Sequence, residues 1–241
     1  FGQVDPILRR PVPVWNPAYW DVTQFRYVLT HIVGINAFFG PALLRTLVYV
    51  GLASLLCLLI AYPVAYYTAR FAGRRRGLLL AALIAPFWIS YMMRMLAWVN
   101  LFSPNGYINK FLVWSHIVTT PPDWLNGNPT SVVLGLIYGY VPYLILPLLA
   151  ALDRIDRSVL EAARDLGASP AQAFYHVTLP LSKPGILGAS VIIALPMFGD
   201  YYTPNIVSSS PRTSMLGNQI DIYFHGGPQP AVGASLTLLL S

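Results

Sequence analysis

Residues 48–67 read VYVGLASLLCLLIAYPVAYY and contain no charged side chain. A helix needs about 20 consecutive apolar residues to cross the roughly 30 Å hydrocarbon core of a bilayer. The segment therefore predicts a transmembrane helix, which we extend to Leu43–Ala69. Pro63 within it indicates a kink, because neighbouring helices in a bundle satisfy the carbonyl that proline leaves unpaired.

Three further stretches have the same character. They are Gly77–Phe102, Thr130–Leu152 and Gly185–Val207, and a fifth begins near Ala231. The composition agrees, since 56% of the 241 residues are hydrophobic and 10% are charged, against about 25% charged in a soluble domain. The predicted fold class is an all-α, polytopic transmembrane helical bundle in one membrane unit.

Basic residues gather in two of the segments that connect these spans. The first holds Arg70, Arg74, Arg75 and Arg76, and the second holds Arg154, Arg157, Arg164 and Lys183. Short cytoplasmic loops carry the excess of Lys and Arg in membrane proteins. Both segments are therefore expected on the cytoplasmic side. Residues 1–40 would then form an extracytoplasmic or interfacial segment, and residues 41–241 the membrane domain, with both termini expected to be truncated.

The cytoplasmic segment 153–184 is too structured for a simple connection. Ser158 and Glu161 form an S-x-x-E capping box, which predicts the start of a helix. Gly167 supplies the left-handed residue that ends such a helix. This segment is either a helical connector between spans or a docking element for another protein.

A second short helix is predicted directly after the glycine. Ser169 is a helix N-cap, Pro170 takes the first helical position, and Gln172 completes another capping box. Leu179-Pro180 is expected to end this helix, because a residue before proline resists the α conformation. The segment is therefore expected to fold as two short helices around a glycine.

Glu161-Ala162-Ala163, Gly167, Val177 and Leu179-Pro180 are similar to the EAA motif of bacterial ABC-importer membrane subunits. The family pattern is E-A-A, three residues, G, nine residues, I, one residue, L-P, and only Val177 departs from it. The resemblance implies a type I ABC-importer fold, in which this loop carries the coupling helix that inserts into a groove of the ATPase. The implied contact residues are Glu161, Ala162, Ala163, Arg164, Asp165, Leu166, Gly167, Ala168 and Ser169.

Other segments resemble the spermidine/putrescine subclass of these permeases. They are Pro86-Phe87-Trp88, Arg94, Ala97-Trp98 and Gly199-Asp200-Tyr201-Tyr202-Thr203-Pro204. This resemblance implies a multi-pass subunit of the inner membrane that imports a polyamine by alternating access. It also implies three kinds of partner, namely an ATP-binding subunit dimer, a second homologous permease subunit and an extracytoplasmic solute-binding protein. Permeases for iron, organic anions or other amines share parts of these motifs and remain alternatives.

Arg94 and Asp200 are ionisable residues that fall inside predicted spans, at similar depth. Such residues are costly in a membrane and usually functional. Either they pair with each other, or Asp200 faces the translocation path and attracts a cationic amine. Aromatic rings bind ammonium groups through cation–π attraction, so the candidate substrate path includes Asp200, Tyr201, Tyr202, Trp88, Tyr91, Arg94 and Trp98.

Sequence patterns of other functions are missing. The only lysines, Lys110 and Lys183, do not lie in a G-x-x-x-x-G-K-[ST] loop, so ATP is expected on a partner subunit. The four histidines lack the spacing of metal ligands, and the sequence has no G-x-S-x-G nucleophile elbow. We therefore expect no metal, no cofactor and no enzyme activity. The net charge of +6 follows the basic loops and does not indicate nucleic-acid binding. An ion-driven secondary transporter would need more acidic residues at the membrane midplane and inverted repeats in the sequence. It is therefore the less favoured alternative.

Overall fold

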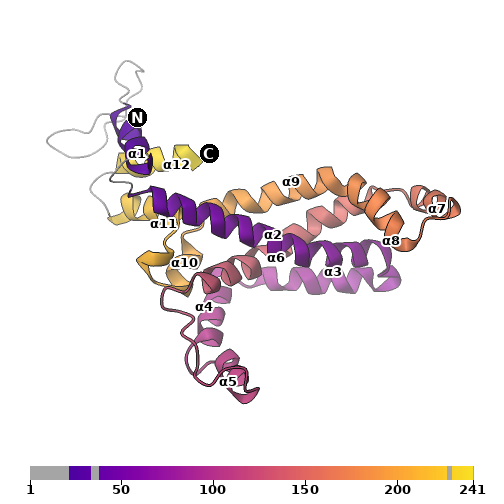
Figure 1. Cartoon of the computed structure of the whole chain (residues 1–241), viewed down its shortest axis with the longest axis horizontal. Helices are drawn as coiled ribbons and strands as arrows, with labels where there is room; N and C mark the ends of the chain where they lie inside the picture. The colour runs from indigo at the N-terminus through magenta and orange to yellow at the C-terminus, as the bar shows by residue number, and fades with distance from the viewer. Residues whose placement is uncertain (1–21, 34–37, 227–229, 241) are drawn as a thin grey trace. The chain divides into compact units, whose positions relative to one another are not determined.

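The structure is a computed structural model that describes residues 22–33, 38–226 and 230–240. Within these ranges helices are the only regular secondary structure (Figure 1). The chain divides into two compact units. The first consists of Phe1–Val50, Trp98–Val132 and Met197–Ser241, and the second of Gly51–Ala97 and Val133–Pro196.

Three of the described helices are long and apolar enough to cross a membrane. They are α2 (Gly40–Arg70), α6 (Pro129–Asp153) and the continuous helix Pro170–Phe198. A fourth span results if the helix pair Gly73–Trp88 and Tyr91–Trp114 is counted as one broken span. The helical membrane architecture is therefore confirmed, and α2 and α6 match the predicted spans within a few residues.

The second predicted span is not one continuous helix, because the helix ends and a new one begins inside it, with a bend of 88° between the two. The 3₁₀ turn η2 (Gly73–Arg75) leads into α3 (Arg76–Ile84), then into the 3₁₀ turn η3 (Ala85–Trp88), and α4 (Tyr91–Phe102) follows the break. Ile89 is extended, with φ −92° and ψ 131°. Pro86 in the first turn of η3 has no N–H to continue the helical ladder, which weakens the helix just before this break.

The fourth predicted span is displaced, because its helix begins at Pro170 and ends at Phe198. It comprises α8 (Pro170–Ala173), the π-helical turn η4 (Phe174–Thr178) and α9 (Leu179–Phe198). The prediction that Leu179-Pro180 ends a helix is wrong, since the wide turn η4 precedes the proline and accommodates its missing N–H. The separate helix α10 (Tyr202–Val207) follows, so Asp200 lies beyond the span.

Within the second unit, the later part of α2 packs along α6 and α9 (Figure 1). The Tyr62 hydroxyl hydrogen-bonds the Ser182 hydroxyl at 2.9 Å and so joins α2 to α9. A Cβ atom on Gly185 would lie 2.2 Å from the Cβ of Ala151. Glycine is therefore required at position 185 for α9 to approach α6 this closely.

The first unit has a buried apolar cluster of its own. It joins α1 (Thr23–Val33) and the start of α2 to α11 (Leu216–Asp221) and α12 (Pro230–Leu240). Its buried residues are Val28, Phe39, Ala42, Leu216, Val232 and Leu236. The unit also contains α5 (Tyr107–Trp114), the 3₁₀ turn η5 (Pro211–Thr213) and the π-helical turn η6 (Ile222–Gly226). Helix α12 confirms that the last apolar stretch is helical. Half of the aromatic residues in 1–40, namely Phe1, Trp15, Tyr19 and Trp20, lie outside the described ranges.

Candidate functional site

Helix α7 (Arg157–Asp165) carries the EAA residues and begins earlier than predicted. Its N-cap is Asp156, whose Oδ1 accepts the backbone N–H of Ser158 at 3.2 Å. The predicted capping box of Ser158 and Glu161 is therefore wrong. Ser158 already lies in the first helical turn, and the extended backbone of Asp156 (φ −61°, ψ 139°) places its carboxylate as the cap.

Helix α7 ends as predicted, at a left-handed glycine. Gly167 has φ +88°, and a Cβ atom at this position would meet no atom within 4 Å. The N–H of Ala168 donates back to the carbonyl of Ala163 at 3.0 Å, which satisfies one of the last carbonyls of the helix. Gly167 is thus needed for its backbone conformation and leaves open space beside the turn.

The second capping box is confirmed. Ser169 Oγ accepts the backbone N–H of Gln172 at 3.3 Å, and Gln172 Oε1 accepts the N–H of Ser169 at 2.8 Å. Two N–H groups at the start of α8 that have no partner within the helix are satisfied in this way. The turn between α7 and α8 is therefore held on both sides of Gly167. We call residues 156–173 the knuckle.

The knuckle presents its EAA residues to the outside of the unit. The exposed members are Glu161, Ala162, Arg164, Asp165, Leu166, Gly167 and Ser169, whereas Ala163 and Ala168 are half-buried. Leu166 is 89% exposed, whereas Leu160 in α7 is half-buried. An exposed leucine at the end of a rigid turn is an apolar contact point available to another protein.

Two sets of contacts fasten the knuckle region to α2. Nη2 of Arg70 donates to the backbone carbonyls of Leu152 and Ile155, each at 3.0 Å. On the other side, the ring of Phe174 packs edge-on against Tyr66, with centroids 5.2 Å apart. The segments on either side of the knuckle are therefore both in contact with the end of α2.

A pocket of about 230 Å³ lies between α7 and the end of α2. Its lining includes Arg70, Arg157, Leu160, Glu161 and Arg164. The two basic loops predicted to share one side of the membrane thus lie together in this unit. They are side by side at the end where α7 and α8 are found (Figure 1).

Arg94 is buried inside the second unit among aromatic rings. It is 4% exposed, and its Cζ lies 5.8 Å from the ring centroid of Phe87, 5.5 Å from that of Tyr91 and 5.9 Å from that of Tyr138. Its Nε and Nη1 have no hydrogen-bond partner among the residues that the structure describes. The rings stabilise the cation, yet two of its donor nitrogens remain unsatisfied.

An aromatic pocket of about 350 Å³ lies beside this arginine. Its lining residues are Tyr91, Tyr140, Tyr143, Ile192, Ile193 and Pro196. Of these, sequence analysis selected Tyr91 and missed the other two tyrosines. Tyr140 and Tyr143 are spaced i, i+3 on α6 and so lie on one helix face. This spacing is the sequence feature that could have indicated them as a pair of pocket residues. Three phenol rings with an apolar floor form a surface suited to alkyl ammonium groups.

The two tryptophans of the predicted substrate path lie elsewhere. Trp88 is 87% exposed in η3 at the break in the second span. Trp98 belongs to the first unit and stacks on Phe102, with ring centroids 4.7 Å apart. Neither tryptophan lines the aromatic pocket.

Asp200 lies in the first unit, after the end of α9 and before the start of α10, and is 7% exposed. Its carboxylate oxygens accept the backbone N–H of Thr203 at 3.0 Å and the Thr203 hydroxyl at 2.7 Å. The carboxylate therefore caps α10. Because Arg94 belongs to the other unit, pairing between these two charges stays a prediction.

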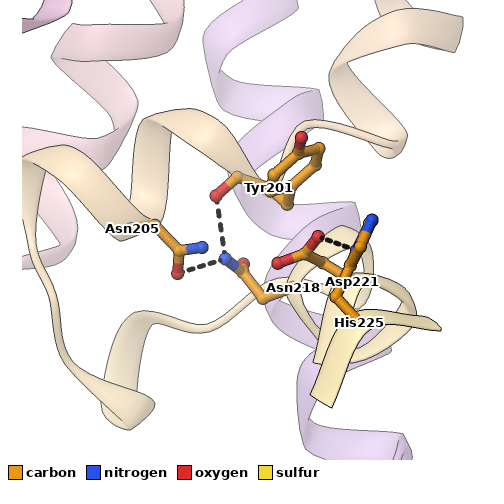
Figure 2. Close-up of polar contacts among 5 residues, drawn as sticks. All are labelled: Tyr201, Asn205, Asn218, Asp221 and His225. Carbon is orange, nitrogen blue, oxygen red and sulfur yellow. Dashed lines mark hydrogen bonds and ion pairs between the residues drawn. The ribbon is translucent and has the colours of Figure 1, made fainter. Parts of the chain in front are cut away.

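The turn that holds Asp200 is braced by Asn218 on α11. Figure 2 shows its Nδ2 donating to the carbonyl of Tyr201 at 2.9 Å and to Oδ1 of Asn205 at 2.8 Å. A Cβ atom on Gly217 would lie 2.6 Å from the carbonyl oxygen of Gly199. Tyr201 remains 37% exposed beside Tyr202, with ring centroids 5.4 Å apart. The turn is thus held by two hydrogen bonds and a close backbone approach, while one of its aromatic rings is accessible.

Comparison with known proteins gives a consistent picture. Residues 61–240 match the family described as "Binding-protein-dependent transport system inner membrane component". The chain is 32% identical over 207 residues to the spermidine/putrescine transport system permease protein PotB of Escherichia coli K12, covering 86% of this chain and 74% of PotB. It is 33% identical to the inner membrane ABC transporter permease protein YdcU of the same organism, covering 78% of this chain and 64% of YdcU.

Solved structures share the fold. A bacterial alginate ABC transporter matches with a TM-score of 0.71 at 18% identity, covering 89% of this chain and 80% of that one. The MetNI methionine ABC transporter matches with a TM-score of 0.61 at 20% identity, covering 85% and 88%. The match to 61–240 and the resemblance to PotB together show that the chain belongs to the inner membrane component family of binding-protein-dependent transport systems, and is a multi-pass membrane permease.

Proposed function

We propose that this chain is the permease subunit of an ATP-driven importer that moves a polyamine, such as spermidine or putrescine, into the cell. The observation that carries the substrate class is the 32% identity to PotB over 86% of this chain. Transport would proceed by alternating access. ATP binding would close a dimer of separate ATPase subunits and move the spans through the knuckle.

The knuckle supports the coupling part of this proposal. Its EAA residues are mostly exposed, Leu166 projects almost fully from the unit, and Gly167 leaves open space at the turn. These features suit insertion into a groove on a partner protein, because a protruding turn with an apolar tip buries area without rearranging. The proposed partners are the ATPase dimer, a second, homologous permease subunit and an extracytoplasmic solute-binding protein.

The aromatic pocket supports the amine part. A ring contributes roughly 0.5–2 kcal/mol to binding a cation, and Tyr91, Tyr140 and Tyr143 line one cavity of about 350 Å³. Its apolar floor of Ile192, Ile193 and Pro196 suits the methylene segments of a polyamine. We propose Asp200 and Tyr201 as further contacts along the path.

One observation favours a second candidate substrate, a small organic anion. Arg94 is buried, and within the described residues its Nε and Nη1 lack acceptors. A carboxylate or phosphate could accept a charge-assisted hydrogen bond from either nitrogen. The identity to PotB outweighs this single residue, and the experiment below separates the two classes.

The test reconstitutes the complete importer with its ATPase and binding protein in proteoliposomes. Labelled spermidine, putrescine and a dicarboxylate are offered in turn. We expect ATP-dependent uptake of the polyamines, competition between them, and no uptake of the dicarboxylate. Uptake of the dicarboxylate that is abolished by Arg94→Gln would establish the anion candidate and reject the polyamine assignment. Co-purification of a separate ATPase subunit that depends on Leu166 would support the docking role of the knuckle.

A further inference from the structure

A polar pocket of about 610 Å³ lies in the second unit where the ends of α2 and α6 meet the starts of α3 and α7. Its charged lining residues are Arg70, Arg76, Asp153, Arg154, Asp156 and Arg157. Four positive groups and two negative groups give this pocket a net charge of +2. The pocket is separate from the aromatic pocket, with which it shares no lining residue.

Both carboxylates of the pocket are already engaged. Asp153 forms an ion pair with Arg76, and Asp156 caps α7 through the N–H of Ser158. The side chains of Arg154 and Arg157 have neither a hydrogen bond nor an ion pair with any residue that the structure describes. The pocket thus holds two uncompensated guanidinium groups.

The neighbouring Arg70 adds a further unsatisfied donor. Its Nη2 binds two backbone carbonyls, whereas its Nε is buried and, within the described part of the chain, has no acceptor. A buried donor without a partner is costly. An anion in this pocket would neutralise Arg154 and Arg157 and lie beside Arg70, which lines the same pocket.

The position of the pocket relative to the spans indicates which kind of anion it binds. The membrane-crossing helices α2 and α6 end at Arg70 and Asp153, and both residues line it. The pocket therefore lies where two membrane-crossing helices end, beside the basic residues of both connecting segments. Basic residues mark the cytoplasmic side, where anionic lipids are concentrated and basic pockets between spans bind their headgroups.

We propose that this pocket binds the phosphate of an anionic phospholipid of the inner leaflet. The planar fork of a guanidinium matches a phosphate with two parallel hydrogen bonds, and Arg154 and Arg157 supply two such forks. Arg157 is the first residue of α7, and Asp156 is its cap. A bound headgroup would therefore hold the start of the knuckle in place and make coupling dependent on anionic lipid.

The experiment uses the purified importer with all its subunits. Binding of phosphatidylglycerol is measured by native mass spectrometry and by titration in phosphatidylcholine nanodiscs. The variant Arg154→Gln/Arg157→Gln is compared with Arg74→Gln/Arg75→Gln, a matched control that removes two exposed arginines next to the pocket, outside its lining. Loss of a charge-assisted hydrogen bond from a guanidinium to a phosphate lowers affinity on the order of tenfold. The pocket variant should therefore bind at least about tenfold more weakly, and the control should stay near wild type.

Three outcomes would overturn the proposal. Equal loss in both variants would assign the effect to diffuse surface charge. Displacement of the lipid by millimolar inorganic phosphate would identify a free-phosphate site. Unchanged lipid binding together with loss of the co-purifying ATPase in Arg154→Gln/Arg157→Gln would identify a protein-docking surface. Since lipid binding is measured without transport, the result does not depend on which solute is imported.

Discussion

Thr203 holds both carboxylate oxygens of Asp200, one through its backbone N–H at 3.0 Å and the other through its hydroxyl at 2.7 Å. The negative charge is thereby fixed at the start of α10, where the helix dipole also favours it. A carboxylate that is oriented in this way can serve as a cap and also present its charge to a cationic solute.

Asp200→Asn should lower polyamine uptake on the order of tenfold, since it removes the charge that attracts the amine, while assembly is retained. The amide Oδ1 can still accept the N–H of Thr203, so the cap largely survives. Thr203→Val is the matched control, because it removes the hydroxyl and leaves the charge. Uptake in proteoliposomes and thermal unfolding measure the two effects. Wild-type transport by Asp200→Asn with only a lower Tm would restrict Asp200 to a packing role.

Gly167→Val should uncouple ATP hydrolysis from uptake. The backbone at φ +88° strains a β-branched residue, although the added side chain meets no atom within 4 Å. Gly167→Asn should retain more transport, because asparagine tolerates the left-handed conformation. ATPase activity and uptake are measured on the same proteoliposomes. Normal stimulation and transport by Gly167→Val would refute the docking role of the turn.

Arg70→Gln should destabilise the junction between α6 and α7. Each hydrogen bond from a charged group contributes about 1.5–3 kcal/mol to the free energy of unfolding. Because Arg70 is partly exposed, we expect a loss of stability at the lower end of this range. Arg70→Lys keeps the charge without the guanidinium fork, so its stability should lie between those of the wild type and of Arg70→Gln. Uptake per ATP hydrolysed is expected to drop while the ATPase still co-purifies. A drop in co-purification with unchanged coupling would place Arg70 in docking instead.

Gly139→Ala should raise the KM for the polyamine. The new Cβ would lie 2.7 Å from Cε2 of the Tyr91 ring, so the ring must turn and the aromatic pocket changes shape. Gly51→Ala is the control, because a Cβ at that position in α2 meets nothing within 4 Å. Initial uptake rates over a range of spermidine concentrations give KM and kcat. Identical KM values for the two variants would exclude the aromatic pocket as the amine site.

Local patterns were enough to predict much of this molecule. The uncharged stretch around Pro63 forms α2, the box of Ser169 and Gln172 starts α8, and Gly167 is left-handed. Each of these features depends on residues within a few positions of one another. Hydropathy, capping hydrogen bonds and glycine conformation act at that range, and the spacing of the EAA motif identified the family correctly.

Tertiary structure decided the features that depend on competition between distant groups. The span before Tyr91 breaks at Ile89, the turn η4 carries a helix through Pro180, and Asp200 caps α10 beyond the end of a span. Whether a proline breaks a helix depends on which neighbours satisfy the freed carbonyls, and the sequence does not name those neighbours. For the same reason, only the packing of α4 and α9 against α6 could bring Tyr91, Tyr140 and Tyr143 to one pocket, and only helix ends that meet in space could collect the arginines beside α7.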